Sequence, residues 1–221
     1  MTTAPARRWV TIEGTNAVGK SHLAALTAAA VGPGCTVLAE LPDTAPGALP
    51  GQVVAALAAG GDPFLRTGHP LTETFALLAL AVRRREQPPE AQVVIEDRGC
   101  DSVAIYQALT VADALGNDPY PILSRLLDAA DRWRVRADVT VLLRDDPAAC
   151  EARWRRRAGR PLTADEADRL MRAAALYDRL AADDPGRYLV VDRARTTADG
   201  ALDLLTTACR PTASTVPGDA P

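Results

Sequence analysis

Short apolar runs alternate along the chain with longer stretches in which apolar residues recur at helical spacing. The runs at 8–13, 92–97 and 138–143 are rich in valine, isoleucine and leucine, and they predict strands that are apolar on both faces. Two further runs, at 36–40 and 188–191, predict shorter strands. Strands of this kind, separated by helices, indicate a parallel sheet covered by helices on both sides, which is an α/β fold.

The helices predicted between these strands carry recognisable start signals. Asp146 and Pro147 supply an N-cap and a first-turn proline, and Thr163 with Glu166 forms a capping box. Three prolines and a glycine predict a loop over 41–50. Helical spacing predicts helices at 22–30, 52–59, 71–85, 102–115, 122–133, after Thr163 and at 197–208, and we expect Trp9, Trp133 and Trp154 in the core or an interface.

Composition and charge are those of one soluble domain. The 221 residues are 48% hydrophobic and 24% charged, with a formal net charge of −3, and we expect one domain over 1–211 with a frayed tail at 212–221. Apolar runs such as 76–82 are far shorter than the roughly 20 residues that a membrane span needs, and no secretory signal is visible. Scattered cysteines and a slightly acidic balance therefore predict a cytoplasmic protein that contacts neither membrane nor nucleic acid.

A glycine-rich motif joins the first predicted strand to the first predicted helix. Residues 14–21 match GxxxxGK(S/T), the P-loop pattern, in the strand-to-helix context that the motif needs. In such a loop, backbone N–H groups and a helix N-terminus bind a polyphosphate, and the lysine adds a mobile cation. Lys20 is the only lysine among the 25 basic side chains. We expect ATP on Gly14, Thr15, Asn16, Ala17, Val18, Gly19, Lys20, Ser21 and His22.

Two further groups of charged residues fit a phosphate site. Asp97 and Arg98 follow a predicted strand, where Asp97 would reach a metal-bound water and Arg98 a phosphate; the alternative is a surface ion pair. Four arginines of a later helix repeat at i, i+3, i+4 and i+7, where like charges repel unless an anion lies among them. They are Arg153, Arg156, Arg157 and Arg160. The segment 153–164 is thus either a lid over a transferred phosphoryl group or a solvated basic face.

Taken together, these motifs resemble those of the thymidylate kinases. Residues 9–21 (WVTIEGTNAVGKS) resemble the strand, IEG and P-loop that open those enzymes, and residues 97–107 (DRGCDSVAIYQ) resemble their DR(Y/H)xxSxxAYQ segment. Residues 78–83 (LALAVR) are similar to their LFAADR helix, and residues 153–160 with Tyr177 are similar to their lid and the helix after it. The likeness extends over about residues 8–192.

The resemblance implies a three-layer P-loop fold with a five-stranded parallel sheet, usually in a homodimer. It also implies transfer of the γ-phosphoryl group of ATP to a pyrimidine deoxynucleoside monophosphate such as dTMP, with Ser21 and Asp97 as the residues for Mg²⁺. Catalytic roles would fall to Lys20, Asp97, Arg98, Arg153 and Arg157. The acceptor nucleotide would contact Glu13, Asn16, Glu40, Arg83, Arg98, Ser102, Tyr106 and Gln107.

Three departures from the family pattern concern the acceptor. Asn16 stands where the family holds an aspartate that binds the sugar 3′-hydroxyl, and Gly99 stands where a tyrosine or histidine is usual. The arginine that precedes the family's equivalent of Glu40 and grips the acceptor phosphate is absent. The sequence therefore leaves open an unusual or modified nucleotide as the acceptor.

Two other functions stay open at this point. A deoxynucleoside kinase would use Glu13 as a general base, because a hydroxyl acceptor must lose a proton whereas a phosphate acceptor is already ionised. A non-enzymatic P-loop protein would instead use nucleotide occupancy as a switch for a partner.

Overall fold

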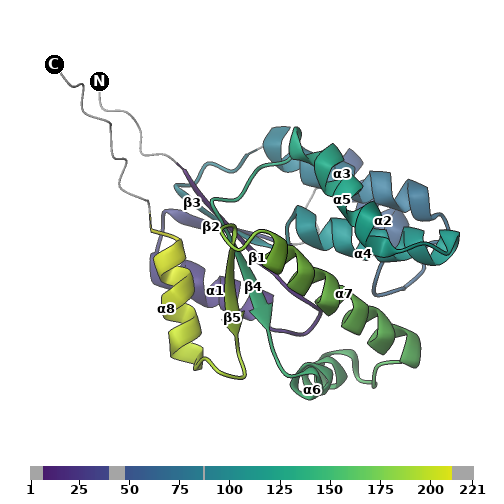
Figure 1. Ribbon diagram of the computed structural model, residues 1–221. Coiled ribbons are helices and arrows are strands. Elements are labelled where there is room, and N and C mark those ends of the chain that lie inside the picture. Colours follow the sequence, from purple (N-terminus) through teal and green to yellow (C-terminus); the bar gives the residue numbers. More distant parts are fainter. Residues whose placement is uncertain (1–6, 40–47, 87, 211–221) are drawn as a thin grey trace.

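Five parallel strands form one sheet in the computed structural model, which describes residues 7–39, 48–86 and 88–210. The strands are β1 (Arg8–Glu13), β2 (Cys35–Leu38), β3 (Val93–Asp97), β4 (Val139–Arg144) and β5 (Tyr188–Asp192). Their spatial order is β2-β3-β1-β4-β5, so β1 lies between β3 and β4 (Figure 1). The prediction of an α/β fold with a five-stranded parallel sheet is confirmed.

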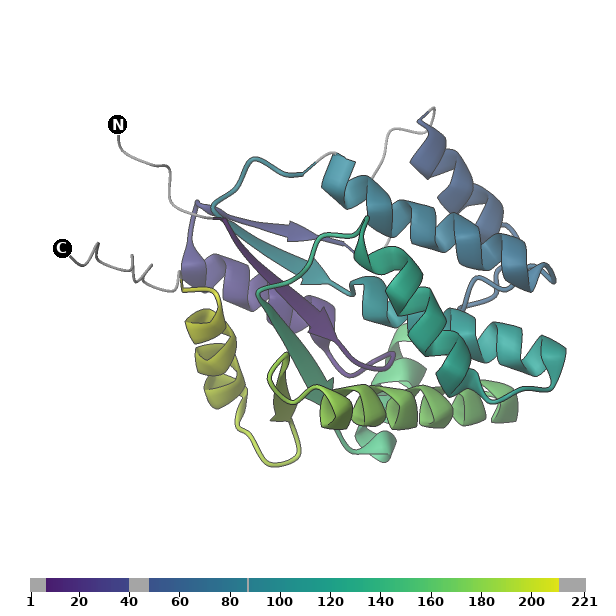
Figure 2. The same ribbon diagram turned by 45° about the horizontal axis from the view of Figure 1, so that its top comes forward.

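Helices cover both faces of this sheet (Figure 1, Figure 2). On one face lie α1 (Lys20–Val31) and α8 (Ala198–Ala208), which contact each other. On the other face lie α4 (Cys100–Leu115), α5 (Pro119–Asp131) and α7 (Ala164–Asp183). The remaining helices are α2 (Leu49–Ala58), which packs on α3 (Pro70–Glu86) beside α4, and α6 (Pro147–Ala158), which follows β4.

Local sequence signals place most of the helix ends. The Asp146 carboxylate accepts hydrogen bonds from two N–H groups of the first turn of α6, and both hydrogen bonds of the predicted capping box form at Thr163 and Glu166. The predicted loop over 41–50 is wrong in its last residues, because α2 begins at Leu49. Pro50 lies in the first turn of that helix, where a missing N–H is harmless.

Two of the three tryptophans are buried as predicted. Trp9 and Trp154 are each 4% exposed, whereas Trp133 is 61% exposed because α5 ends at Asp131, before the predicted helix would have carried Trp133 inward. The predicted tail at 212–221 and Glu40 lie outside the described residues. Within the described ranges, no helix is long and apolar enough to cross a membrane.

Apolar packing is divided between the two faces of the sheet. Val10 and Ile12 of β1 pack with residues of α1 and α8 in one cluster. Leu142 and Tyr188 pack with α4, α5 and α7 in the other, where Tyr177 is fully enclosed. Both clusters bury large aliphatic side chains almost completely, and burial on this scale is the main favourable term in folding.

The central strands are not apolar on both faces, and that expectation is wrong for β1 and β3. Their α4 side carries Thr11, Glu13 and Glu96, which are all buried. Buried carboxylates require partners, and here arginines from distant segments supply them around a small enclosed hollow. These are Arg84, Arg134 and Arg187.

Asp101, at the start of α4, is the acid of this polar layer that bonds to residues at the start of β5. Its side chain is 1% exposed, both of its oxygens accept hydrogen bonds from Arg187, and it accepts another from the Tyr188 hydroxyl at 2.6 Å. Arg134 lies 3.8 Å away. Asp101 therefore ties the start of α4 to β5 through charge that has almost no access to water.

We predict that Asp101→Ala lowers the free energy of unfolding by about 3 kcal/mol, because it leaves buried arginines without their carboxylate. Urea denaturation measures the change. The matched control is Glu151→Ala, which removes an exposed ion pair with Arg155 on α6 and should cost less than about 0.5 kcal/mol. Equal losses in the two variants would contradict the prediction.

Candidate active site

The candidate site lies where the carboxyl ends of β1 and β3 meet. β1 continues into the P-loop and then α1, whereas β3 continues through Asp97 and Arg98 into α4 on the opposite face. The two chain ends stay paired past the strands, since the Arg98 N–H donates to the Ile12 carbonyl at 3.0 Å. Parallel sheets bind ligands at the point where neighbouring strands send their helices to opposite faces.

The P-loop wraps around the ammonium group of Lys20. Its Nζ donates to the Gly14 carbonyl at 2.9 Å and the Thr15 carbonyl at 2.7 Å, and the side chain is almost fully buried. Gly14 has φ +135°, and a Cβ there would stand 2.5 Å from the Leu143 carbonyl oxygen, so only glycine fits. The loop is thus shaped by close backbone contacts that hold a single small cation at its centre.

A cavity of about 570 Å³ opens beside this loop, and we call it the donor cavity. Most of the residues predicted for ATP, metal and lid line it: Asn16, Ala17, Gly19, Lys20, Ser21, His22, Asp97, Arg98, Arg153 and Arg157. Five predicted residues do not: Gly14, Thr15 and Val18 of the loop, and Arg156 and Arg160 of the lid. The carbonyls of Gly14 and Thr15 accept hydrogen bonds from Lys20, and Val18 is buried in the apolar core.

Ser21 and Asp97 are the two residues of the donor cavity suited to a divalent cation. The described part of the chain holds no group of three or more His, Cys, Asp or Glu side chains that would bind a metal alone. One hydroxyl and one carboxylate fit Mg²⁺, which keeps several waters and takes its other ligands from substrate phosphates. The donor set therefore suits a cation that arrives with a nucleotide.

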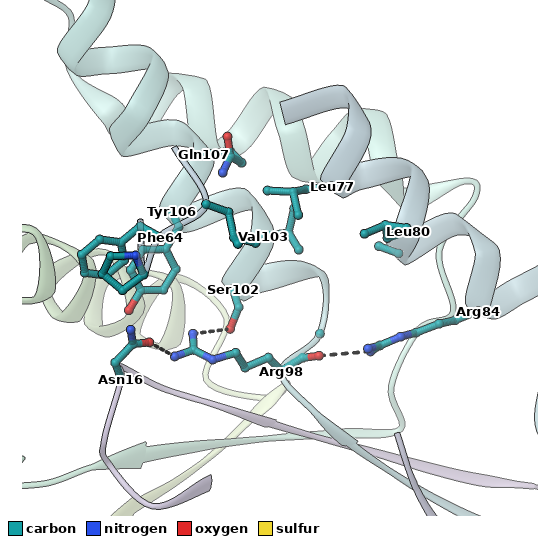
Figure 3. A pocket seen from close by; sticks show the side chains of 14 residues that line it. Asn16, Phe64, Leu77, Leu80, Arg84, Arg98, Ser102, Val103, Tyr106 and Gln107 are labelled. Carbon is teal, nitrogen blue, oxygen red and sulfur yellow. Dashed lines mark hydrogen bonds between the residues drawn. The ribbon is translucent and has the colours of Figure 1, made fainter. Parts of the chain in front are cut away.

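A second pocket adjoins the first, and we call it the acceptor pocket (Figure 3). Its lining includes the predicted residues Asn16, Arg98, Ser102, Tyr106 and Gln107. Phe64 stacks on Tyr106 with ring centroids 5.6 Å apart, and Leu77 and Leu80 line the far end. The pocket thus has a polar end at Arg98 and an apolar, aromatic end.

Arg98 stands between the two cavities and lines both. Its backbone has φ +65°, which is uncommon for a residue with a side chain. The guanidinium donates to Asn16 Oδ1 and to Ser102 Oγ, the latter at 3.4 Å, and lies over the Tyr106 ring (Figure 3). These contacts hold the guanidinium at the junction of the two cavities.

Gly99 is the residue that lets the turn after Arg98 lie close to the sheet. A Cβ there would stand 2.7 Å from Thr11 Cγ2 and 3.0 Å from Glu96 Oε2. Glu13 also accepts a hydrogen bond from the Gly99 N–H at 2.9 Å. The departure from the family pattern at this position therefore has a steric reason, because the buried acids beneath the turn leave no room for a side chain.

Two predicted acceptor residues are not brought to the pocket. Arg83 lies instead in a shallow hollow with Val53 and Glu86, between α2 and α3. Its neighbour Arg84 lines the acceptor pocket, is paired with Glu96 and donates to the Arg98 carbonyl at 3.1 Å. One residue along a helix turns a side chain by about 100°, so the motif alone could not decide which arginine faces inward.

Glu13 is the other predicted residue that lines neither cavity. It is 0% exposed and accepts hydrogen bonds from Gly99, from the Ser102 hydroxyl and from the Tyr177 hydroxyl. Burial, with the nearby charge of Asp101, raises the pKa of Glu13 to about 7. Glu13 therefore supports the turn and Ser102 from beneath, with Ser102 between it and the acceptor pocket.

Sequence reasoning missed Phe64 and Arg84, which line the acceptor pocket, and Arg193, which contacts the P-loop. Phe64 follows the Gly-Gly-Asp-Pro breaker at 60–63, and an aromatic residue in a loop was the available signal. Arg193 follows β5 and donates to the Val18 carbonyl of the P-loop. No local pattern marked Arg193, because its contact with the P-loop spans 175 positions of sequence.

The fold and the two joined cavities define a class: a P-loop α/β protein with a phosphate site at the end of β1 and a second ligand pocket at the end of β3. The chain matches no family model. A probable thymidylate kinase from Methanosarcina barkeri (strain Fusaro / DSM 804) is 32% identical over 104 residues, which are 47% of this chain and 48% of that protein. The chain thus spans about half the length of the curated relative that it matches.

Solved structures of thymidylate kinases have the same fold. The enzyme from Ehrlichia chaffeensis has a TM-score of 0.61 at 19% identity, with 92% of this chain and 96% of that chain covered. The enzyme from Candida albicans has a TM-score of 0.67 at 18% identity, with 92% and 91% covered. The resemblance to thymidylate kinases is confirmed, and this chain has their fold.

We predict that Glu13→Gln flattens the pH dependence of stability. With the native pKa raised from 4.5 to about 7, the contribution of Glu13 is fully present below pH 4.5 and is lost as pH rises through about 7. Urea unfolding at pH 5.5, 6.5 and 7.5 measures the free energy of unfolding of the wild type and the variant. The wild type should lose stability over this range more steeply than Glu13→Gln, and parallel curves would contradict the prediction.

Proposed function

We propose that the protein is an ATP-dependent nucleoside monophosphate kinase of the thymidylate kinase type. Its acceptor is a pyrimidine deoxynucleoside monophosphate, either dTMP or a modified analogue. The observation that carries the proposal is the junction of the donor cavity and the acceptor pocket at Asn16 and Arg98. A phosphate bound at the P-loop and a phosphate bound at Arg98 would meet there.

On the donor side, the P-loop amides and Lys20 bind the polyphosphate of ATP. Ser21 and Asp97 would hold Mg²⁺, with Asp97 acting on the waters of the ion, and the ion would neutralise phosphate charge. Lys20 already lies among the loop carbonyls in this structure. A short shift of its flexible side chain brings the ammonium to the phosphates.

On the acceptor side, the charge of Arg98 fixes the orientation of the nucleotide. Its phosphate lies at the Arg98 end and its base at the apolar end, between Phe64, Tyr106 and Leu77. Gln107 is 1% exposed, and its amide oxygen accepts a hydrogen bond from the Thr74 hydroxyl at 3.1 Å, which presents a fixed amide to the base. Asn16 reaches the sugar as a neutral partner, since it lies beside Arg98.

The chemical step is an in-line displacement. An oxygen of the acceptor phosphate attacks the γ-phosphorus, the bond from that phosphorus to the β,γ-bridging oxygen breaks, and ADP leaves. The attacking oxygen is already ionised, so no general base is needed. The lid, about residues 153–164, supplies Arg157 to the charge that spreads over the transferred group, while Arg153 braces the P-loop by donating to the Ala17 carbonyl at 2.6 Å.

The two alternatives have less support. A nucleoside kinase with Glu13 as base needs that carboxylate within hydrogen-bond reach of the acceptor hydroxyl, but Glu13 lines neither cavity and is fully buried. A nucleotide switch leaves unexplained a second pocket that opens onto the phosphate site. Phosphoryl transfer accounts for both cavities.

A homodimer in the cytoplasm completes the proposal. Leu71, Phe75 and Ala79 recur every four residues on the exposed side of α3, with Leu71 58% and Phe75 69% exposed. An exposed apolar stripe of this kind fits a symmetric interface between two copies. The four cysteines are free thiols, which suits a reducing compartment.

We predict that Lys20→Arg lowers turnover by at least about 100-fold, because a planar guanidinium is too wide for the space between the Gly14 and Thr15 carbonyls. The assay measures ADP release with ATP, Mg²⁺ and a panel of nucleoside monophosphates and nucleosides. Deoxypyrimidine monophosphates should be the best acceptors. A nucleoside preferred over every monophosphate, or ADP release that needs no acceptor, would refute the proposed function.

We predict that Phe75→Glu converts a dimer into a monomer, because it places a charge in the apolar stripe of α3. Light scattering after size-exclusion chromatography should give twice the 23.3 kDa chain mass for the wild type and a single chain mass for the variant. Met171→Glu, at a position on α7 that is 66% exposed, is the control and should remain dimeric. A monomeric wild type would contradict the proposed dimer.

A further inference from the structure

The arginines of α6 differ in what they contact. Arg153 pairs with Asp145 at 2.6 Å and donates to the P-loop, so its position is fixed. Arg155 points away from the donor cavity and pairs with Glu151. Arg157 lines the donor cavity and has no hydrogen bond or ion pair with any residue in the described part of the chain. Its guanidinium lies 5.3 Å from the centre of the Trp154 ring.

Trp154 is buried at the wall of the donor cavity and carries two guanidinium groups. It is 4% exposed, and Arg160 lies 5.7 Å from the same ring centre. Its indole Nε1 has no hydrogen-bond partner among the described residues. Its contacts with charged groups are therefore made by the face of the ring, which attracts cations through its quadrupole.

Arg160 is held in place from the next helix. It donates to both oxygens of Glu166, at 2.7 and 2.5 Å, and Glu166 is the buried third residue of the capping box of α7. The charge of Arg160 lowers the pKa of Glu166 to about 2, so the pair stays ionised at neutral pH. One of the two cations on the ring is thus neutralised, and the charge of Arg157 is left to face the cavity.

We propose that Trp154 is a positioning residue that holds Arg157 at the wall of the donor cavity for the phosphates of the bound nucleotide. A guanidinium is weakly hydrated and stacks well on an aromatic face, so the indole restricts the arginine without neutralising it. A carboxylate partner would fix Arg157 equally well but would cancel the charge that a phosphate needs. The proposal rests on the proposed function for the identity of the ligand, but the contact itself is a property of this chain.

The test is a double-mutant cycle on binding and on turnover. Trp154→Leu, Arg157→Ala and the double variant are compared by calorimetry with a non-hydrolysable ATP analogue and Mg²⁺, and by kcat and KM. Arg157→Ala should weaken analogue binding about 10-fold and Trp154→Leu about 3- to 10-fold, and the double variant should be no weaker than Arg157→Ala. Trp154→Phe retains an aromatic face and should stay within about 2-fold of the wild type. Arg155→Ala is the matched control on α6 and should bind like the wild type.

Losses that add in the double variant would overturn the proposal, since Trp154 would then act only as a buried apolar residue. A Trp154→Phe variant as weak as Trp154→Leu would overturn it as well. If Trp154→Leu does not fold, the test is the tryptophan fluorescence of proteins that keep Trp154. Tripolyphosphate with Mg²⁺ should change the emission of the wild type and Arg155→Ala but not that of Arg157→Ala, and an unaltered response in Arg157→Ala would count against the contact.

The same experiment separates this proposal from the proposed function. A wild type that binds the analogue with a coupled Trp154–Arg157 cycle but transfers no phosphoryl group to any acceptor would refute the kinase and keep the positioning role. A wild type that phosphorylates dTMP but shows an additive cycle would keep the kinase and refute the positioning role.

Discussion

The parallel pairing of β1 with β3 is the constraint on which the site depends. Ile12 lies opposite Asp97 in this pair, and the Arg98 N–H extends the ladder by one more bond to the Ile12 carbonyl. Because the two strands continue into helices on opposite faces, their ends diverge and leave two cavities with Arg98 between them. A shift of one residue in this register would move Asp97 and Arg98 away from the P-loop.

A layer of buried charge supports this edge of the sheet from within. Glu96 and Asp101 are paired with arginines of α3, of the segment before β4 and of the position before β5. Glu13 accepts hydrogen bonds from the hydroxyl groups of Ser102 on α4 and Tyr177 on α7. Buried ion pairs add little net stability over apolar packing, but their geometry is specific, because a misplaced arginine leaves a charge unpaired. In this protein they fix the turn at Gly99, and through Ser102 they orient the side chain of Arg98.

The same arrangement separates the fixed charges of the site from those left for ligands. Arg84 is paired with Glu96, Arg153 with Asp145 and Arg160 with Glu166. Arg98 is held by the neutral Asn16 and Ser102, and Arg157 lies on the Trp154 ring. Arg157 is thus oriented by an aromatic ring, which keeps its charge for a ligand phosphate and limits the cost of rearrangement.

The sequence by itself determined the order of strands and helices along the chain, the P-loop and the helix caps. It also determined that Asp97 lies near the phosphate site. These features depend on local periodicity and on contiguous motifs. Only the tertiary structure decided that Arg84 and not Arg83 enters the acceptor pocket, that Glu13 is enclosed, that Phe64 lines the acceptor pocket and that Arg193 contacts the P-loop. These outcomes depend on the rotation of a helix about its axis and on contacts between segments far apart in the chain. Local sequence carries no record of either, since both are fixed only when the layers pack together.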